Sequence, residues 1–179
     1  AACSFIASKS GHQTALMAPT EILAQQHFQT FSQLLEPLGL KIALQTGSTK
    51  HVKPGVDDHF DVLVGTHALL SDIVNFDNLG LVVIDEQHRF GVEQRTKLIA
   101  KGQNGDLSPH VLSMTATPIP RTIALTLYGD LDVQSITELP PGRKPVKTWV
   151  VTESKRKAAY KWIQEQIDSA NPHNQVFIV

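Results

Sequence analysis

The sequence has little cysteine and no excess of charge of either sign. Its 179 residues include one Cys and carry a formal net charge of -1. One thiol and eight histidines without metal-ligand spacing give no basis for a structural zinc site. The lone thiol suits a reducing compartment and favours a cytoplasmic location. The near-zero net charge argues against a polyelectrolyte partner that binds the whole surface, but it is compatible with a local basic strip that binds phosphates.

Long apolar runs, repeats and low-complexity segments are also missing. No apolar run is long enough to span a bilayer, and we find no signal peptide. The phosphate-binding pattern G-x-x-x-x-G-K-[ST] does not occur, because Gly47-Ser48-Thr49-Lys50 lacks its spacing and precedes no clear helix. Hydrophobic residues make up 41% of the chain and charged residues 18%, which is typical of a globular chain with a core. The length predicts one domain, or one domain and part of another.

Strand and helix patterns alternate densely along the chain. Strands are expected at 14–18, 41–45, 61–65, 81–84 and 110–114, and helices over 20–35, 93–100 and 120–128. The strands at 81–84 and 110–114 are apolar enough to be buried. This alternation predicts an α/β fold with a parallel sheet flanked by helices.

A second α/β unit is expected to begin after the only linker-like run, Pro140-Pro141-Gly142-Arg143-Lys144-Pro145. A strand at 146–151, a helix over 155–169 capped by Ser154, and an apolar strand at 176–179 should follow it. The predicted organisation is therefore a first domain at 1–139, a linker at 140–146, and the beginning of a second domain at 147–179.

Two adjacent carboxylates, Asp85 and Glu86, directly follow the apolar residues 81–84. Open α/β sheets bind their ligands outside the carboxyl ends of the strands. At such a position Asp85 can hold Mg²⁺ against nucleotide phosphates, and Glu86 can orient an attacking water and take its proton. An acidic turn that happens to follow a core strand is the alternative interpretation.

Three other polar stretches also lie where a predicted strand ends. Pro19-Thr20-Glu21 opens a helix whose free N–H groups suit a phosphate, although helix capping explains Thr20 equally well. Gly65-Thr66-His67 combines a glycine that permits close backbone approach with two side chains able to donate hydrogen bonds, and a plain loop is its alternative. Thr115-Ala116-Thr117 places hydroxyl groups where they can link the nucleotide end of the sheet to the far side of a cleft. The alternative is a strand that ends at a proline.

The order of these stretches resembles the superfamily 2 helicases. Residues 18–25, 65–67 and 113–118 match the family's motifs Ia, Ib and III, and Asp85-Glu86-Gln87-His88 matches motif II in the branch written Asp-Glu-x-His. The longer runs 83–95, 114–122 and 138–145 are similar to the RecG family of bacterial branched-DNA helicases. The transcription-repair coupling translocases are also similar, but their linker differs from residues 140–145.

This resemblance implies RecA-like motor domains and an ATP hydrolase that moves on branched or forked DNA in recombination and repair. It also implies a bacterial, nucleoid-associated protein that needs neither a membrane nor an oligomer. A transcription-repair coupling translocase or an Asp-Glu-x-His RNA helicase is an alternative motor. A non-catalytic nucleic-acid-binding module is the alternative of another class, and the intact Asp85 and Glu86 argue against it.

The resemblance further implies roles for individual residues. Asp85 holds Mg²⁺, and Glu86 acts on the hydrolytic water. The motif II and III residues that relay the state of the γ-phosphate to the DNA side are His88, Thr115, Ala116 and Thr117. The residues that contact the DNA backbone are Pro19, Thr20, Glu21, Gly65, Thr66 and His67. Arg143 and Lys144 of the linker are further candidates for DNA phosphates, and a solvated hinge is the alternative.

Several segments of the motor that the resemblance implies are not present in this sequence. The family's phosphate-binding loop with its Lys is expected before Ala1, its arginine finger after Val179, and an amino-terminal wedge domain outside the chain. We therefore expect a piece of a longer helicase, nearly inactive alone. The strand of the phosphate loop should lie beside residues 110–114, so without it this strand should expose backbone groups that another segment must cover.

Overall fold

The computed structural model describes residues 1–49, 59–105, 107–116, 132–136, 138, 146–168 and 175–177. The chain divides into two compact units, Ala1–Gly129 and Asp130–Val179. The linker predicted at 140–146 falls in the second unit, and all but its last residue lies outside the described residues. Its role as a domain boundary therefore stays a prediction.

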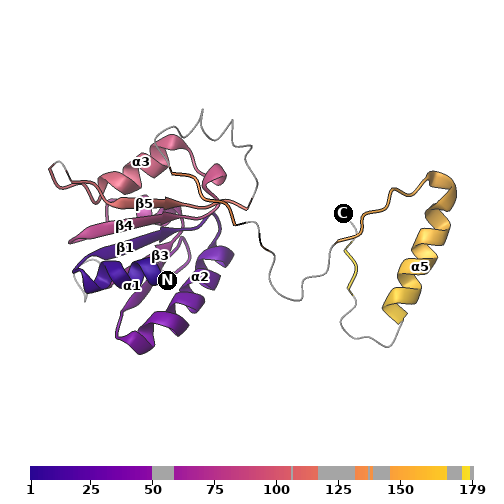
Figure 1. Cartoon of the computed structure of the whole chain (residues 1–179), viewed down its shortest axis with the longest axis horizontal. Helices are drawn as coiled ribbons and strands as arrows, with labels where there is room; N and C mark the ends of the chain where they lie inside the picture. Colours follow the sequence, from indigo (N-terminus) through magenta and orange to yellow (C-terminus); the bar gives the residue numbers. More distant parts are fainter. Residues whose placement is uncertain are drawn as a thin grey trace. The chain divides into compact units, whose positions relative to one another are not determined.

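The first unit is built on one sheet of five strands in the order β2-β3-β1-β4-β5. The strands are β1 (Gln13–Met17), β2 (Ile42–Gln45), β3 (Val62–Gly65), β4 (Leu79–Ile84) and β5 (His110–Ser113). Every pairing is parallel, so all five carboxyl ends meet at one edge of the sheet (Figure 1). The predicted α/β fold with a parallel sheet is confirmed, and each strand lies within two residues of its expected bounds.

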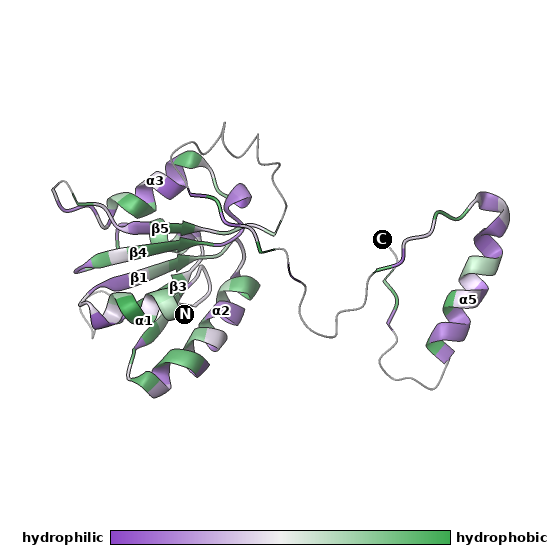
Figure 2. Cartoon of the chain, viewed as in Figure 1, coloured by the Kyte–Doolittle hydropathy of each residue, from purple (hydrophilic) through white to green (hydrophobic). Residues whose placement is uncertain are grey.

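Helices cover both faces of this sheet. Alternate residues of β4 point to opposite faces, and their apolar side chains divide between two core clusters. Most of β4 is hydrophobic (Figure 2). Leu81 and Val83 belong to the cluster that includes side chains of α1 (Ala2–Lys9) and α2 (Glu21–Leu35). Val82 and Ile84 belong to the other, with Leu98 of α3 (Val92–Ala100). Each fully buried side chain of this size contributes roughly 1.5–3 kcal/mol, so β4 is held firmly from both sides.

The strand β5 is more exposed than the sequence predicts. Val111 and Leu112 are 36% and 42% exposed, so the prediction of a buried strand at 110–114 is wrong. The physical reason is its place at the edge of the described sheet, where β4 is the one described strand that pairs with it. The expected exposed edge is therefore found, whereas the expected covering segment is not present among the residues that the structure describes.

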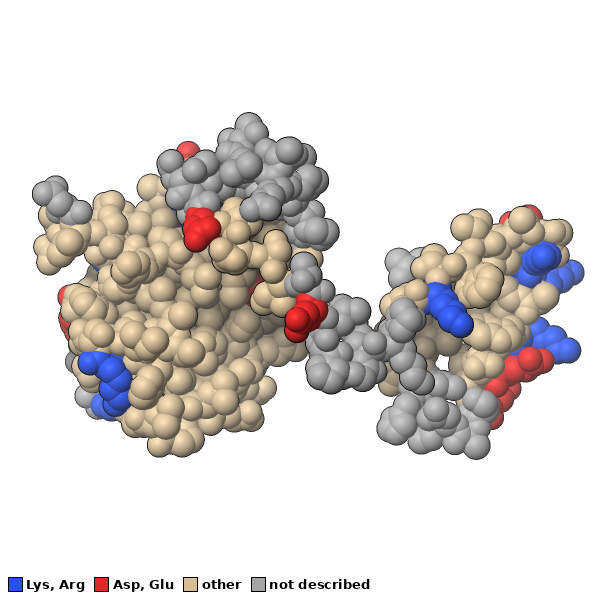
Figure 3. Space-filling view, viewed as in Figure 1, with Lys and Arg blue, Asp and Glu red and all other residues tan. Residues whose placement is uncertain are grey.

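The described part of the second unit contains the short helix η4 (Glu153–Lys155) and helix α5 (Arg156–Asp168). The helix predicted at 155–169 is confirmed for most of its length, but Ser154 lies inside η4 and does not cap it. Basic and acidic side chains lie along α5 (Figure 3).

The prediction of a strand at 146–151 is wrong, because these residues are not in a strand and their side chains are exposed. An apolar segment becomes a strand only when a neighbour accepts and donates its backbone hydrogen bonds, and no described segment pairs with this one. Val176 and Phe177 are likewise not in a strand, and the remainder of the strand predicted there lies outside the described residues. The helix predicted at 120–128 lies outside them entirely. Within the described ranges, no helix is both long enough and apolar enough to cross a membrane.

Candidate active site

Asp85 lies directly after β4 at the carboxyl edge of the sheet. Its backbone N–H donates to the Met17 carbonyl at 2.9 Å, so the pairing with β1 continues one residue beyond the strand. Its carboxylate accepts from the Glu86 N–H through Oδ1 at 2.9 Å and lies 2.7 Å from His27 Nε2 through Oδ2. Because a carboxylate only accepts hydrogen bonds, the His27 ring is the donor. Both oxygens of Asp85 therefore have a fixed partner.

Glu86 has an unusual backbone conformation. Its φ is 48° and its ψ is 51°, and no other non-glycine residue in the described ranges has a positive φ. This left-handed conformation costs an ordinary residue about 1–2 kcal/mol, and such strained residues cluster at functional sites. The carboxylate oxygen Oε2 accepts from the Ala116 N–H at 3.3 Å and lies 3.5 Å from His88 Nδ1. The strained turn thus aims Glu86 at the segment that follows β5.

The acidic segment and the segment after β5 are joined by further hydrogen bonds. The Gln87 N–H donates to the Met114 carbonyl at 3.0 Å. His88 Nδ1 lies 3.3 Å from the Thr115 hydroxyl. The residues predicted to act on the nucleotide and those predicted to relay its state are therefore in direct contact. Thr117, the last residue of the predicted relay, lies outside the described residues.

Thr20 and Glu21 have local partners at the start of α2. The Thr20 hydroxyl accepts from the Leu23 N–H at 3.3 Å, so helix capping is found. The Glu21 carboxylate accepts from the Ser48 hydroxyl at 2.6 Å and the Ser48 N–H at 3.1 Å. Both hydrogen bonds stabilise the charged carboxylate and hold the pKa of Glu21 below its usual value, and the bond from the Ser48 hydroxyl contributes most. The predicted contacts of both residues with DNA stay predictions.

We expect Thr20→Ala to lower the free energy of unfolding by about 1 kcal/mol, because the N–H at Leu23 loses its acceptor. Thr20→Ser keeps the hydroxyl and should retain most of the stability. Urea unfolding followed by circular dichroism compares the two variants. Equal losses in both would show that the cap contributes nothing.

The segment predicted to contact DNA after β3 is partly buried. Thr66 is 2% exposed, and its hydroxyl caps the short helix η2 (His67–Leu70) by accepting from the Ala68 N–H at 3.5 Å. A Cβ on Gly65 would lie 2.2 Å from the Gln45 carbonyl oxygen, so the neighbouring strand β2 requires glycine here, and the predicted contact with DNA stays a prediction. His67 alone of the three has an exposed side chain. For Arg143 and Lys144, both outside the described residues, the structure adds nothing to the prediction.

Sequence reasoning missed two residues of this site. His27 contacts Asp85 from α2, and Gln87 is 7% exposed and accepts from Arg95 at 3.5 Å. Neither residue lies in a pattern that predicts such a contact. The one available signal for His27 is its position seven residues after Thr20, which places both on one face of a helix that starts at the site.

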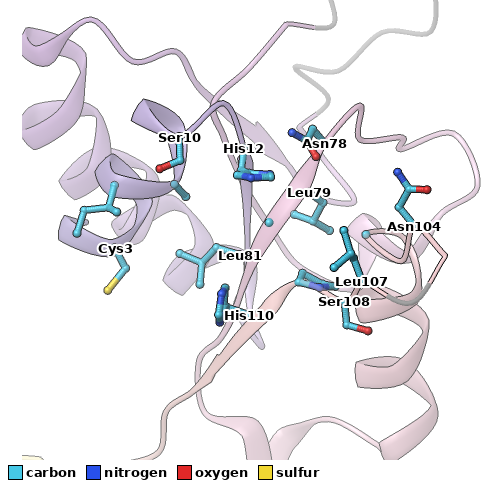
Figure 4. A pocket seen from close by; sticks show the side chains of 15 residues that line it. Cys3, Ser10, His12, Asn78, Leu79, Leu81, Asn104, Leu107, Ser108 and His110 are labelled. Atoms are coloured by element: carbon cyan, nitrogen blue, oxygen red, sulfur yellow. The ribbon is translucent and has the colours of Figure 1, made fainter.

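A cavity of about 660 Å³ lies elsewhere, at the amino ends of β4 and β5 (Figure 4). It is lined by residues of α1, by the start of β4 and by the segment that leads into β5, including Cys3, His12 and His110. A cavity of this volume could hold a small-molecule ligand. None of the site residues predicted from the sequence lines it, so we place the chemistry at the carboxyl edge instead.

Comparison with known proteins identifies the family. The family described as DEAD/DEAH box helicase matches residues 1–126. The chain belongs to the DEAD/DEAH box helicase family. It is 54% identical to the ATP-dependent DNA helicase RecG of Aquifex aeolicus (strain VF5), over 91% of this chain and 21% of that protein. It is 52% identical to the RecG of Synechocystis, over 97% of this chain and 21% of that protein.

Solved structures agree with this family. A RecG bound to a three-way DNA junction has a TM-score of 0.69 and 42% identity, covering 88% of this chain and 21% of that one. The yeast DEAD-box splicing factor Prp28 has a TM-score of 0.52 at 19% identity, covering 66% of this chain and 30% of that one, and supports the fold alone. The fold is that of a RecA-like helicase domain, and the predicted resemblance to superfamily 2 helicases and to RecG is confirmed. The chain spans about a fifth (21%) of the length of these RecG relatives.

The oxygen donors at Asp85 and Glu86 would suit the magnesium ion that the sequence predicts. Both side chains offer carboxylate oxygens, the ligands that Mg²⁺ prefers. In the described part of the chain, no group of three or more His, Cys, Asp or Glu side chains could hold a metal ion.

Proposed function

We propose that this chain is part of the motor of an ATP-dependent DNA helicase that acts on branched or forked DNA in recombination and repair. Residues 1–139 form most of the first motor domain, residues 140–146 the linker, and residues 147–179 the start of the second. The observation that carries the proposal is the Asp85–Glu86 pair, which ends β4 and is hydrogen-bonded to Ala116 after β5. It occurs in a chain that is 54% identical to an ATP-dependent DNA helicase RecG.

The proposed chemistry divides between the two carboxylates. Asp85 would hold Mg²⁺ with the phosphates of ATP, and the bound ion would neutralise their negative charge. Glu86 would orient the hydrolytic water and accept its proton. Its carboxylate is already held by the Ala116 N–H, so little reorganisation is needed before water is activated.

The same edge of the sheet would connect hydrolysis to DNA. The segments with Thr20 and His67 follow β1 and β3, and β1 pairs with both β3 and β4. One proposed DNA contact therefore follows β1, the strand next to β4, and the other follows β3, on the far side of β1. His88 and Thr115 would relay the state of the γ-phosphate through their mutual contact.

ATP hydrolysis by the full-length protein tests this function when it is measured with forked DNA, linear duplex DNA and RNA of equal length. Forked DNA should stimulate the rate most. Stimulation by RNA alone would indicate an RNA helicase instead, and equal stimulation by both DNAs would indicate a duplex translocase. DNA binding without hydrolysis would indicate a non-catalytic module.

We expect replacement of both Arg143 and Lys144 by Ala to weaken DNA binding by the full-length protein. If the two cations contact phosphates, the slope of log affinity against log salt should fall in magnitude by about one or two units. The double variant Lys157→Ala/Lys161→Ala on α5 removes the same charge and serves as the control. An unchanged slope in the linker variant would leave these residues as a solvated hinge.

A further inference from the structure

His27 joins helix α2 to the proposed metal-binding carboxylate. Its Nε2 lies 2.7 Å from Asp85 Oδ2, although the two residues are 58 positions apart in the sequence. The His27 side chain is 26% exposed and that of Asp85 is 19% exposed. A charge-assisted hydrogen bond that is largely shielded from water is stronger than one on the open surface.

The fold explains why this histidine reaches the site. The helix α2 follows β1 after a short turn, and β1 is the neighbour of β4. Helix α2 therefore starts at the same carboxyl edge as Asp85. His27 lies seven residues after the Thr20 cap, two turns along the helix and on the same face. The helix thus carries both a proposed DNA contact and the partner of Asp85.

We propose that His27 is a positioning residue for Asp85, an inference that rests on the proposed function. The Glu86 N–H holds one carboxylate oxygen of Asp85 and the His27 ring holds the other. Without His27 the carboxylate keeps one partner and is free to turn about its own axis. With His27 it keeps a single orientation, and the remaining lone pairs of its oxygens stay available to the ion.

A direct bond from His27 to the ion does not fit this site. Mg²⁺ prefers oxygen ligands, and the His27 Nε2–H already points at Asp85. His27 would act as the hydrogen-bonding partners of metal ligands generally do, by fixing the orientation of the ligand. Loss of such a partner typically costs about 10- to 100-fold in metal affinity or activity.

The test compares His27→Leu with His27→Gln in the full-length protein. Leu keeps apolar bulk and removes the donor, whereas the Gln amide places a donor near the position of Nε2. Mn²⁺ affinity in the presence of a hydrolysis-resistant ATP analogue is measured by electron paramagnetic resonance. The Mg²⁺ concentration that gives half-maximal hydrolysis is measured in parallel.

We expect His27→Leu to weaken Mn²⁺ binding about 10- to 100-fold and to raise the Mg²⁺ requirement by a similar factor. His27→Gln should restore most of both. Gln29→Leu, an exposed position on the same helix, is the control and should change neither. If His27→Leu does not fold, His27→Asn makes the same comparison, because its amide is too short to reach Asp85.

Unchanged or tighter Mn²⁺ binding in the variants without the donor would overturn the proposal. The His27–Asp85 contact would then be purely structural or would compete with the ion. Failure of the proposed function gives a different result, since the wild-type protein itself would show no Mg²⁺-dependent hydrolysis. The Mn²⁺ titration does not depend on turnover, so it still reports the role of His27 wherever the wild-type protein binds Mn²⁺.

Discussion

Glu86→Gln in the full-length helicase should reduce ATP turnover by about 100- to 10,000-fold while leaving ATP binding intact. The amide keeps the size of the side chain and an oxygen for the Ala116 N–H, so the local hydrogen bond survives. It cannot accept a proton from water at neutral pH. The substitution therefore removes the step assigned to Glu86 without removing a ligand of the nucleotide. Steady-state hydrolysis and titration with a fluorescent ATP analogue measure the two effects separately.

Glu93→Gln is the matched control for this prediction. Glu93 lies in the first turn of α3 and is exposed, so the same change of charge occurs in the next helix along the chain. It should leave turnover within about twofold of wild type. Substitutions at exposed positions usually change the stability of the protein very little. Near-normal turnover of Glu86→Gln would remove Glu86 from the mechanism.

Gly65→Ala should destabilise the fold by about 3 kcal/mol or more. The added methyl group would lie 2.2 Å from the Gln45 carbonyl oxygen and within 2.9 Å of two Leu69 side-chain atoms. The carbonyl belongs to β2, which is paired with β3 at that point, so neither strand can move away without losing ladder hydrogen bonds. Urea unfolding followed by circular dichroism measures the loss.

Gly91→Ala is the control for the glycine prediction. Gly91 has a φ of −65°, which any residue adopts, and the nearest atom to an added Cβ is 4.0 Å away. Its cost should stay below about 1 kcal/mol. If Gly65→Ala were equally mild, the close approach of β2 and β3 would not be a constraint on this residue.

Local pattern was enough to predict the sheet and the residues at its carboxyl edge. The strands are short and mostly apolar, and β4 is buried on both faces, as residues 81–84 suggest. Parallel pairing places all strand ends at one edge, so Asp85, Glu86, His88 and Thr115 are expected there, and their direct contact follows from the observed pairing of β4 with β5. The capping hydroxyl of Thr20 is similarly a local feature.

Features that depend on neighbours in space could not be predicted in this way. Residues 110–113 are apolar enough for a buried strand, but their burial depends on whether another strand pairs beyond them. Residues 146–151 have strand propensity, yet no described segment provides hydrogen-bond partners. The contact of His27 with Asp85 depends on how α2 packs against β4, and the left-handed turn at Glu86 has no signature in the sequence.

The most direct test of the central claim is a crystal structure of the full-length protein with Mn²⁺ and a hydrolysis-resistant ATP analogue. Anomalous scattering locates Mn²⁺ without ambiguity. We predict one anomalous peak beside the Asp85 carboxylate, with the γ-phosphate facing Glu86. A nucleotide and its metal bound elsewhere, for example in the cavity at the amino ends of β4 and β5, would contradict the account.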